Sequence, residues 1–196
     1  VMIEGQSGVV PVSVTTVVAM QRLMATGSNV LGEVPVARWD VGGLHEVPDG
    51  IASRRRYGGF VSSEIWFDSS AFAVSTVEAA AMDPQQQLLL ERGYEALHST
   101  KIGRSVLLGS VTGIFVGVTF LVFEEILLTS PLGATVYAAT GSGHSIASGR
   151  LAYALDTHGP CLSMDTACSA ALAACHSASK ALRRVECCRA LAAGVN

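Results

Sequence analysis

Residues 159–172 read GPCLSMDTACSAAL, and this stretch decides the fold. A glycine–proline turn signal comes first, followed by a short, mostly apolar run over 161–164 that is typical of a buried strand. Asp165 and Thr166 are both favourable helix N-caps. The alanine-rich stretch after them predicts a helix of about four turns. The predicted order is therefore strand, tight turn, Cys168 and helix.

Cys168 stands where a thiol can be activated. The thiolate is the nucleophilic form of cysteine, and the unpaired N–H groups and partial positive charge of a helix N-terminus favour an anion. The same N–H groups are suited to hold a developing oxyanion. The alternative is a buried structural cysteine, because cysteine also packs as a small hydrophobic residue. Position alone leaves the two interpretations open.

The segment DTACSAAL (165–172) resembles the active-site segment of β-ketoacyl synthases, in particular the ketosynthase domains of modular polyketide synthases. Further blocks resemble the same family in the same order, over roughly residues 30–196. These blocks are VPVARWDV (34–41), YGGFV (57–61), AMDPQQQLLLE (81–91), TGIFVGVT (112–119), ATGSGHSIASGRLAYALDTHGP (139–160) and LAAGVN (191–196).

The resemblance implies an α/β fold: the N-terminal half of a thiolase-like fold, with a mostly parallel, covered sheet and the nucleophile at a strand-to-helix turn. It divides the chain into a divergent N-terminal segment, 1–33, and a partial ketosynthase N-terminal domain, 34–196, whose C-terminal half is absent. The helix predicted over 142–154 and the strand after it are implied to form part of a homodimer interface.

The function implied by the resemblance is that of a β-ketoacyl synthase in polyketide or fatty acid biosynthesis. Cys168 would accept an acyl group, and decarboxylative Claisen condensation with a malonyl group on an acyl carrier protein would follow. The substrates are phosphopantetheine-linked, and no cofactor or metal of the domain's own is implied. The two histidines and the lysine that assist this reaction belong to the C-terminal half, so we expect the 196 residues alone to be inactive. We also expect them to be poorly soluble, because half of the fold would expose the apolar surface against which the other half packs.

Two other classes of function are open to the chain. A non-catalytic, ketosynthase-like partner or regulatory protein would keep the half-fold without the chemistry. A cysteine hydrolase of the α/β-hydrolase type would need glycines two positions either side of its nucleophile. Thr166 and Ala170 occupy those positions here, which argues against a hydrolase.

Composition indicates a well-buried globular protein: 49% of the 196 residues are hydrophobic and only 15% are charged. The net charge of −3 offers no basic surface for nucleic acid. Five cysteines without a signal peptide indicate a reducing compartment, and therefore a cytoplasmic location, with an organelle such as a plastid also open. The uncharged run 105–123 is long enough to cross a membrane, but its glycines and β-branched residues favour a buried strand over 111–118.

The rest of the chain carries weaker signals. We expect a strand over 9–18, a short helix over 17–25, and surface loop over 34–70 with turns at 42–43, 48–50 and 58–59. We also expect a helix over 79–97, with Asp83 as its cap and Pro84 at its first helical position. Gln87 stands where the family usually has arginine, which predicts the loss of an ion pair. The short basic run 54–56 is interpreted as solvated loop in preference to a carrier-protein contact, and the apolar run 120–123 as core in preference to an acyl pocket.

None of the five histidines is a convincing base for Cys168. His176 lies eight residues along the predicted helix, about 12 Å away by helix rise. His158 lies at the far end of the preceding strand, His45 lies in a loop, and His98 follows a helix as a cationic cap. His144 is the least excluded, although its surroundings, GSGHS, match no catalytic histidine motif.

Overall fold

The computed structural model describes residues 1–11, 14–38, 51, 54–61, 67–119 and 122–195. The chain divides into two compact units. The larger unit contains Val1–Gln6 and Trp66–Asn196, and the smaller contains Ser7–Ile65. The larger unit carries Cys168 and all the elements that position it.

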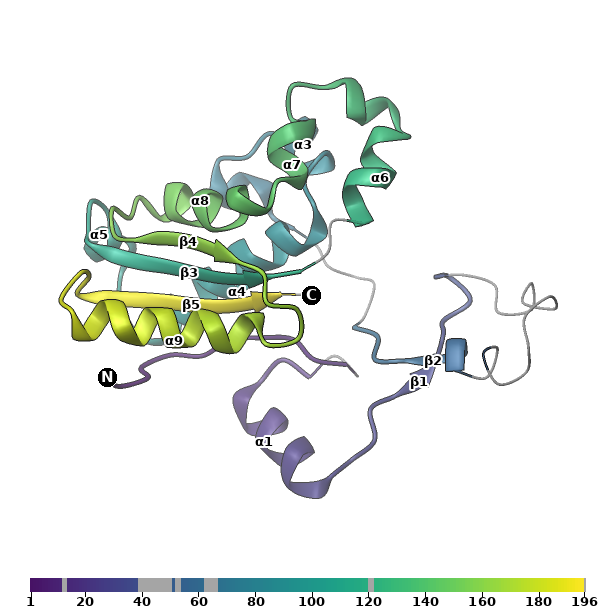
Figure 1. Cartoon of the computed structure of the whole chain (residues 1–196), viewed down its shortest axis with the longest axis horizontal. Helices are drawn as coiled ribbons and strands as arrows, with labels where there is room; N and C mark the ends of the chain where they lie inside the picture. Colours follow the sequence, from purple (N-terminus) through teal and green to yellow (C-terminus); the bar gives the residue numbers. More distant parts are fainter. Residues whose placement is uncertain (12–13, 39–50, 52–53, 62–66, 120–121, 196) are drawn as a thin grey trace. The chain divides into compact units, whose positions relative to one another are not determined.

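A three-stranded parallel sheet forms the centre of the larger unit, in the order β4-β3-β5 (Figure 1). The strands are β3 (Thr112–Val118), β4 (Cys161–Met164) and β5 (Arg189–Val195). Every residue of β3 is buried, as expected of a central strand covered on both faces. The predicted parallel sheet and the strand predicted over 111–118 are therefore confirmed.

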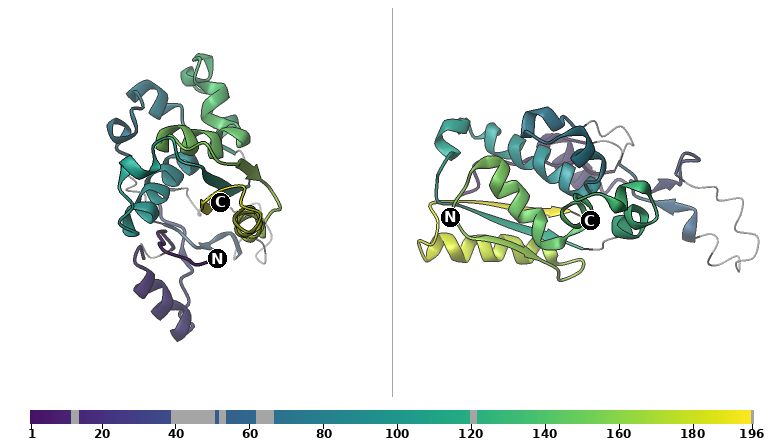
Figure 2. Two further views of the ribbon diagram at one scale, coloured as in Figure 1. Left: turned by 90° about the vertical axis from the view of Figure 1, so that its left-hand side faces the viewer. Right: turned by 90° about the horizontal axis from the view of Figure 1, so that it is seen from above.

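Helices cover both faces of this sheet (Figure 2). Because side chains alternate along a strand, Ile114 and Val116 point to one face and pack in a cluster with α4 (Pro84–Ser99) and α8 (His144–Leu155). Phe115 points to the other face and packs against α9 (Ala170–Arg183). The predicted covered α/β fold is confirmed, as is the helix of about four turns after Cys168.

Short helical elements connect these layers. They are η2 (Ser69–Phe72), α3 (Thr76–Ala80), α5 (Arg104–Leu107), α6 (Val122–Leu128), η3 (Pro131–Ala134) and α7 (Ala138–Ser142). The helix expected over 142–154 is confirmed as α8, with α7 directly before it. The run 105–123 is divided among α5, β3 and the start of α6. No helix of the described residues is long and apolar enough to cross a membrane.

The helix predicted over 79–97 is instead two helices, α3 and α4, separated at Asp83. Asp83 caps α4 as predicted: its Oδ1 accepts a hydrogen bond from the Gln85 N–H at 2.8 Å, and Pro84 occupies the first turn. Gln87 donates from Nε2 to the carbonyls of Ala79 (3.0 Å) and Met82 (3.3 Å). Its amide thereby ties α4 to the end of α3 without a charge.

The smaller unit contains α1 (Val17–Thr26) and a two-stranded antiparallel sheet, β1 (Gly32–Glu33) with β2 (Tyr57–Gly58). The helix expected over 17–25 is confirmed, with Thr16 as N-cap and Gly27 (φ 58°) as C-cap. The strand expected over 9–18 is wrong where the structure describes it: of residues 9–11 and 14–18, Val10 and Val14 form an isolated bridge, and Val17 and Val18 belong to α1. The expected loop over 34–70 contains β2 and the start of η2.

Several predictions fall wholly or partly on residues outside the described ranges. His45 and the turns expected over 42–50 lie there, as do Phe120 and Leu121 of the apolar run 120–123. Arg54, Arg55 and Arg56 are described and exposed, in agreement with a solvated loop.

The predicted burial of the strand at 161–164 is wrong. Cys161 and Leu162 are exposed, and 48% of Leu162 is accessible. Within the described part of the chain β4 is an edge strand that pairs with β3 alone. Its apolar sequence is that of a covered strand, but on one side no described strand pairs with it.

The start of α9 packs directly on two paired glycines, Gly117 and Gly194, which we call the glycine seat. Gly117 on β3 lies opposite Gly194 on β5 in the parallel register. A Cβ on Gly117 would lie 2.3 Å from the backbone carbonyl carbon of Ala170, and one on Gly194 would lie 2.4 Å from the Ala171 Cβ. Such distances are impossible for a side chain, so the start of the helix can lie this close to the sheet only because both strands have glycine here.

We predict that Gly117→Ala and Gly194→Ala each destabilise the chain by about 1–3 kcal/mol, because the added methyl group must push the start of α9 away from the sheet. Gly149→Ala in α8 is the matched control, since a Cβ there meets nothing within 4 Å. It should be neutral or stabilising by up to about 1 kcal/mol, as expected for alanine in a helix interior. Urea denaturation of the three variants tests this. Equal changes in the free energy of unfolding at all three positions would contradict the claim that α9 packs directly on Gly117 and Gly194.

Candidate active site

Cys168 lies in a five-residue turn between β4, which ends at Met164, and α9, which begins at Ala170. Its side chain is exposed, which excludes the buried structural cysteine considered from the sequence. Ser169 is the N-cap residue, and its side chain makes no capping hydrogen bond to the first turn. The predicted N-cap role of Asp165 and Thr166 is therefore wrong, and the positive end of the α9 dipole is left to act on the neighbouring thiol.

The turn is held by side-chain hydrogen bonds around a residue of unusual backbone conformation. Ala167 has a φ of 53°, a left-handed conformation that is unfavourable for any residue with a Cβ. The Asp165 carboxylate accepts a hydrogen bond from the Ala167 N–H at 2.8 Å. The Ser169 hydroxyl lies 2.8 Å from the Thr166 carbonyl and 3.0 Å from its Oγ1. These bonds hold the turn in which Cys168 is exposed.

This arrangement suits a nucleophile. The thiol is accessible to a substrate and adjacent to a helix N-terminus, whose N–H groups favour an oxyanion formed next to it. Of the described residues, no three His, Cys, Asp or Glu side chains lie close enough together to share a metal ion. The chemistry that the geometry supports is attack by the Cys168 sulfur on an acyl carbonyl.

The described histidines lie away from this turn. His176 is exposed further along α9, and His158, at the start of β4, lies 3.4 Å from the Asp156 carboxylate. His98 stacks on Tyr94 in α4, with ring centroids 5.9 Å apart. His144 begins α8, on the face of the sheet opposite α9. In the described part of the chain, none of these four forms a hydrogen bond or ion pair with Cys168.

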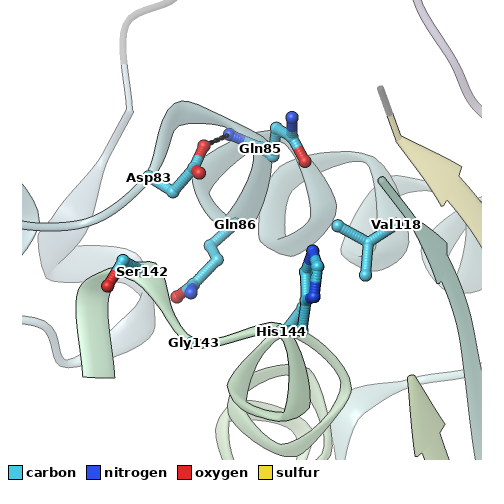
Figure 3. A pocket seen from close by; sticks show the side chains of 8 residues that line it. Asp83, Gln85, Gln86, Val118, Ser142, Gly143 and His144 are labelled. Atoms are coloured by element: carbon cyan, nitrogen blue, oxygen red, sulfur yellow. Dashed lines mark hydrogen bonds between the residues drawn. The ribbon is translucent and has the colours of Figure 1, made fainter. Parts of the chain in front are cut away.

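His144 lines a small cavity instead (Figure 3). The cavity lies where α4 and α8 begin, at the C-terminal end of β3, and Asp83, Gln85 and Gln86 also line it. The His144 Nε2 and Gln85 Oε1 atoms are buried without a hydrogen-bond partner among the described residues. Asp83 is 4% exposed, and burial raises the pKa of its carboxyl, opposed by the Gln85 N–H bond and by the charge of His144.

One buried polar network was not predicted from the sequence. Arg150 of α8 forms an ion pair with Glu78 of α3, and its Nε donates to Gln86 Oε1 at 2.9 Å. Gln86 in turn donates from Nε2 to the carbonyl of Gly141 at 3.0 Å. A charged residue within a helix of small residues is the signal that could have indicated it, but its side-chain partners Gln86 and Glu78 lie 64 and 72 positions away.

The chain belongs to the β-ketoacyl synthase family. The family profile described as "Beta-ketoacyl synthase, N-terminal domain" matches residues 1–196. The match includes the segment 1–33, which was predicted from the sequence to be divergent from the family. The predicted family and its thiolase-like fold are confirmed by this match and by the structures below.

The relatives of the chain include large polyketide synthases. The chain is 40% identical over 176 residues to a phenolphthiocerol/phthiocerol polyketide synthase of Mycobacterium tuberculosis, covering 88% of this chain and 11% of that protein. It is 41% identical over 199 residues to pikromycin polyketide synthase component PikAII of Streptomyces venezuelae, covering all of this chain and 5% of that protein.

Among solved structures, the oxazolomycin ketosynthase domain OzmH KS7 of Streptomyces albus is similar, with a TM-score of 0.85 and 32% identity. The match covers 99% of this chain and 35% of that one. A ketosynthase of the bacillaene synthase of Bacillus subtilis matches with a TM-score of 0.82 and 27% identity, over 99% of this chain and 31% of that one. The chain thus spans about a third of a solved ketosynthase.

The buried Asp83 carboxyl predicts a pH dependence of stability. Because its pKa is raised in the folded chain, the folded chain holds a proton that the unfolded chain releases above about pH 4. Stability should therefore fall as pH rises from about 4 through the raised pKa. Asp83→Asn keeps an N-cap acceptor but does not titrate, so this part of the fall should disappear in urea denaturation measured from pH 4 to 7.

Asp68 provides a control, because its pKa is shifted in the direction opposite to that of Asp83. The Ser70 hydroxyl and then the Ala71 N–H lower the pKa of this exposed carboxyl. The contribution of Asp68 to the stability of the fold is present above about pH 4 and is lost as pH falls through the lowered pKa. Asp68→Asn should change the profile only at the acidic end, and identical profiles for wild type and Asp83→Asn would contradict the account of Asp83.

Proposed function

We propose that Cys168 is the acyl-accepting nucleophile of a polyketide synthase ketosynthase domain, of which these residues form the N-terminal part. The observation that carries the proposal is the exposed thiol at a strained strand-to-helix turn, at the uncapped start of α9, in a chain of the β-ketoacyl synthase family. The polyketide synthases among its relatives give the reaction class.

In the proposed first step the Cys168 thiolate attacks the carbonyl of an acyl thioester on the phosphopantetheine arm of an acyl carrier protein. The N-terminal end of α9 stabilises the negative charge that develops on the carbonyl oxygen. The carrier's thiol leaves, takes up a proton, and the acyl group remains on Cys168. No cofactor other than the carrier's own arm takes part.

In the second step a malonyl group on the carrier protein loses carbon dioxide, and the resulting carbanion attacks the acyl carbon on Cys168. The new carbon–carbon bond displaces the Cys168 thiolate. This step requires groups that stabilise the enolate, and the described histidines do not lie at Cys168. We therefore propose that the 196 residues alone support the first step and not the condensation.

We also propose that the domain acts as a homodimer through α8 and β4. Tyr153 on α8 is 88% exposed, and Leu162 on β4 is 48% exposed, so the edge strand and the adjacent helix carry apolar side chains that need cover. A second copy in two-fold symmetry would provide that cover. A cytoplasmic location stays a prediction.

The test is intact-protein mass spectrometry after incubation of the chain with an acyl thioester such as an acyl-N-acetylcysteamine. We predict one added acyl group, located at residue 168 by peptide mapping and absent from Cys168→Ala. Cys175→Ala is the matched control, because Cys175 is also exposed and lies on α9, and it should acylate like wild type. A folded chain that is not acylated would contradict the proposed first step and favour a non-catalytic partner.

A further inference from the structure

Two serines join α8 to β4 on the face of the sheet opposite α9. The Ser163 hydroxyl accepts a hydrogen bond from the Ser148 N–H at 3.2 Å. It also donates one to Ser148 Oγ at 2.8 Å. Ser148 is only 2% exposed, so both bonds are partly buried. A hydrogen bond shielded from water is electrostatically stronger than one at the surface.

Among the other restraints on β4, Met164 packs against the cluster around Phe115, and its sulfur accepts a hydrogen bond from the Ser177 hydroxyl at 3.9 Å. In the described part of the chain its backbone pairs with β3 alone, over the four residues Cys161–Met164. The first half of the strand is exposed, and exposed edge strands are among the parts of a fold that open most easily. The Ser163 side chain is thus a main lateral link between this strand and the rest of the unit.

The helix at the other end of this link is firmly held. Arg150, two residues beyond Ser148, has a side chain only 11% exposed and pairs with Glu78. It also donates to Gln86 at 2.9 Å and to the Thr140 carbonyl at 3.3 Å. α8 is therefore tied to α3, α4 and α7, and the position of Ser148 follows from that network.

We propose that Ser163 is a positioning residue for Cys168. The two lie five positions apart in the chain, and the turn between them starts where β4 ends. The serine pair fixes the beginning of the turn against α8, while the glycine seat fixes its end at α9. Without the Ser163 hydroxyl, the end of β4 moves and the thiol leaves its place at the helix N-terminus. The inference rests on the proposed function only in taking Cys168 as the reactive group.

The experiment measures the rate at which iodoacetamide alkylates Cys168, relative to the exposed Cys175 further along the same helix. Peptide mapping by mass spectrometry gives both rates from one sample, so Cys175 is an internal reference. We expect Ser163→Ala to lower the ratio by a factor of about two to five, the size of a helix-terminus effect on a charge. Ser163→Thr keeps the hydroxyl and should restore the ratio.

Two further variants sharpen the result. Ser148→Ala removes one of the two hydrogen bonds and should give an intermediate ratio. Ser145→Ala, at an exposed serine of the same helix, is the matched control and should leave the ratio unchanged. If Ser163→Ala does not fold, Ser148→Ala decides the matter: a ratio equal to that of wild type would overturn the proposal.

Thermal unfolding of each variant separates positioning from stability. A fall in melting temperature with an unchanged Cys168 to Cys175 ratio would make Ser163 a structural residue only, and the proposal would be wrong. Alkylation requires no acyl substrate. Failure of wild-type acylation together with the expected ratios would therefore count against the proposed function and leave the role of Ser163 standing.

Discussion

The start of α9 lies closer to the sheet than any side chain would allow. Gly117 and Gly194 face each other on adjacent strands, and the backbone of Ala170 and Ala171 occupies the space that two methyl groups would fill. This approach fixes where the helix begins and therefore where its dipole acts. The turn that carries Cys168 has to connect β4 to that fixed point within five residues. The sharp bend and the positive φ of Ala167 follow from that short connection.

The side chains of β3 point alternately to the two faces of the sheet and support this arrangement. Its side chains divide between two clusters, one with α4 and α8 and one with α9, so a single buried strand joins both layers. Phe115 is among the largest fully buried side chains, and it packs against the middle of α9 while Gly117 accepts its start. Large and small residues on one strand thus set the distance and direction of the helix that presents the thiol.

Local sequence signals predicted those parts of the fold that depend on near neighbours. Asp83 with Pro84 predicted the start of α4, and the apolar run at 112–118 predicted the central strand, because capping and burial patterns act over a few residues. The burial of β4 and the caps of α9 were wrong. An apolar strand does not say whether its neighbour lies in the same chain, and Asp165 bonds to Ala167 within the turn instead of capping the helix.

The position of Cys168 was predicted from sequence, but what surrounds it was not. The serine pair and the Arg150 network join residues that are 15 to 72 positions apart, which no local pattern indicates. For the five histidines, spacing in the sequence already argued against a base at Cys168, and the geometry of the four described ones agrees. The turn leaves the Cys168 thiol exposed beside the start of α9.

Amide hydrogen exchange over residues 165–175 tests most directly whether the glycine seat holds the turn. In wild type we expect these amides to exchange slowly from Ala173 onward, because the Ala173 N–H donates to the Ser169 carbonyl at 2.9 Å. In Gly117→Ala exchange in this segment should accelerate, while peptides from α4 keep their wild-type rates. Equal rates in the two proteins over 165–175, or a uniform acceleration across the whole unit, would contradict the claim that contact with the seat determines where Cys168 lies.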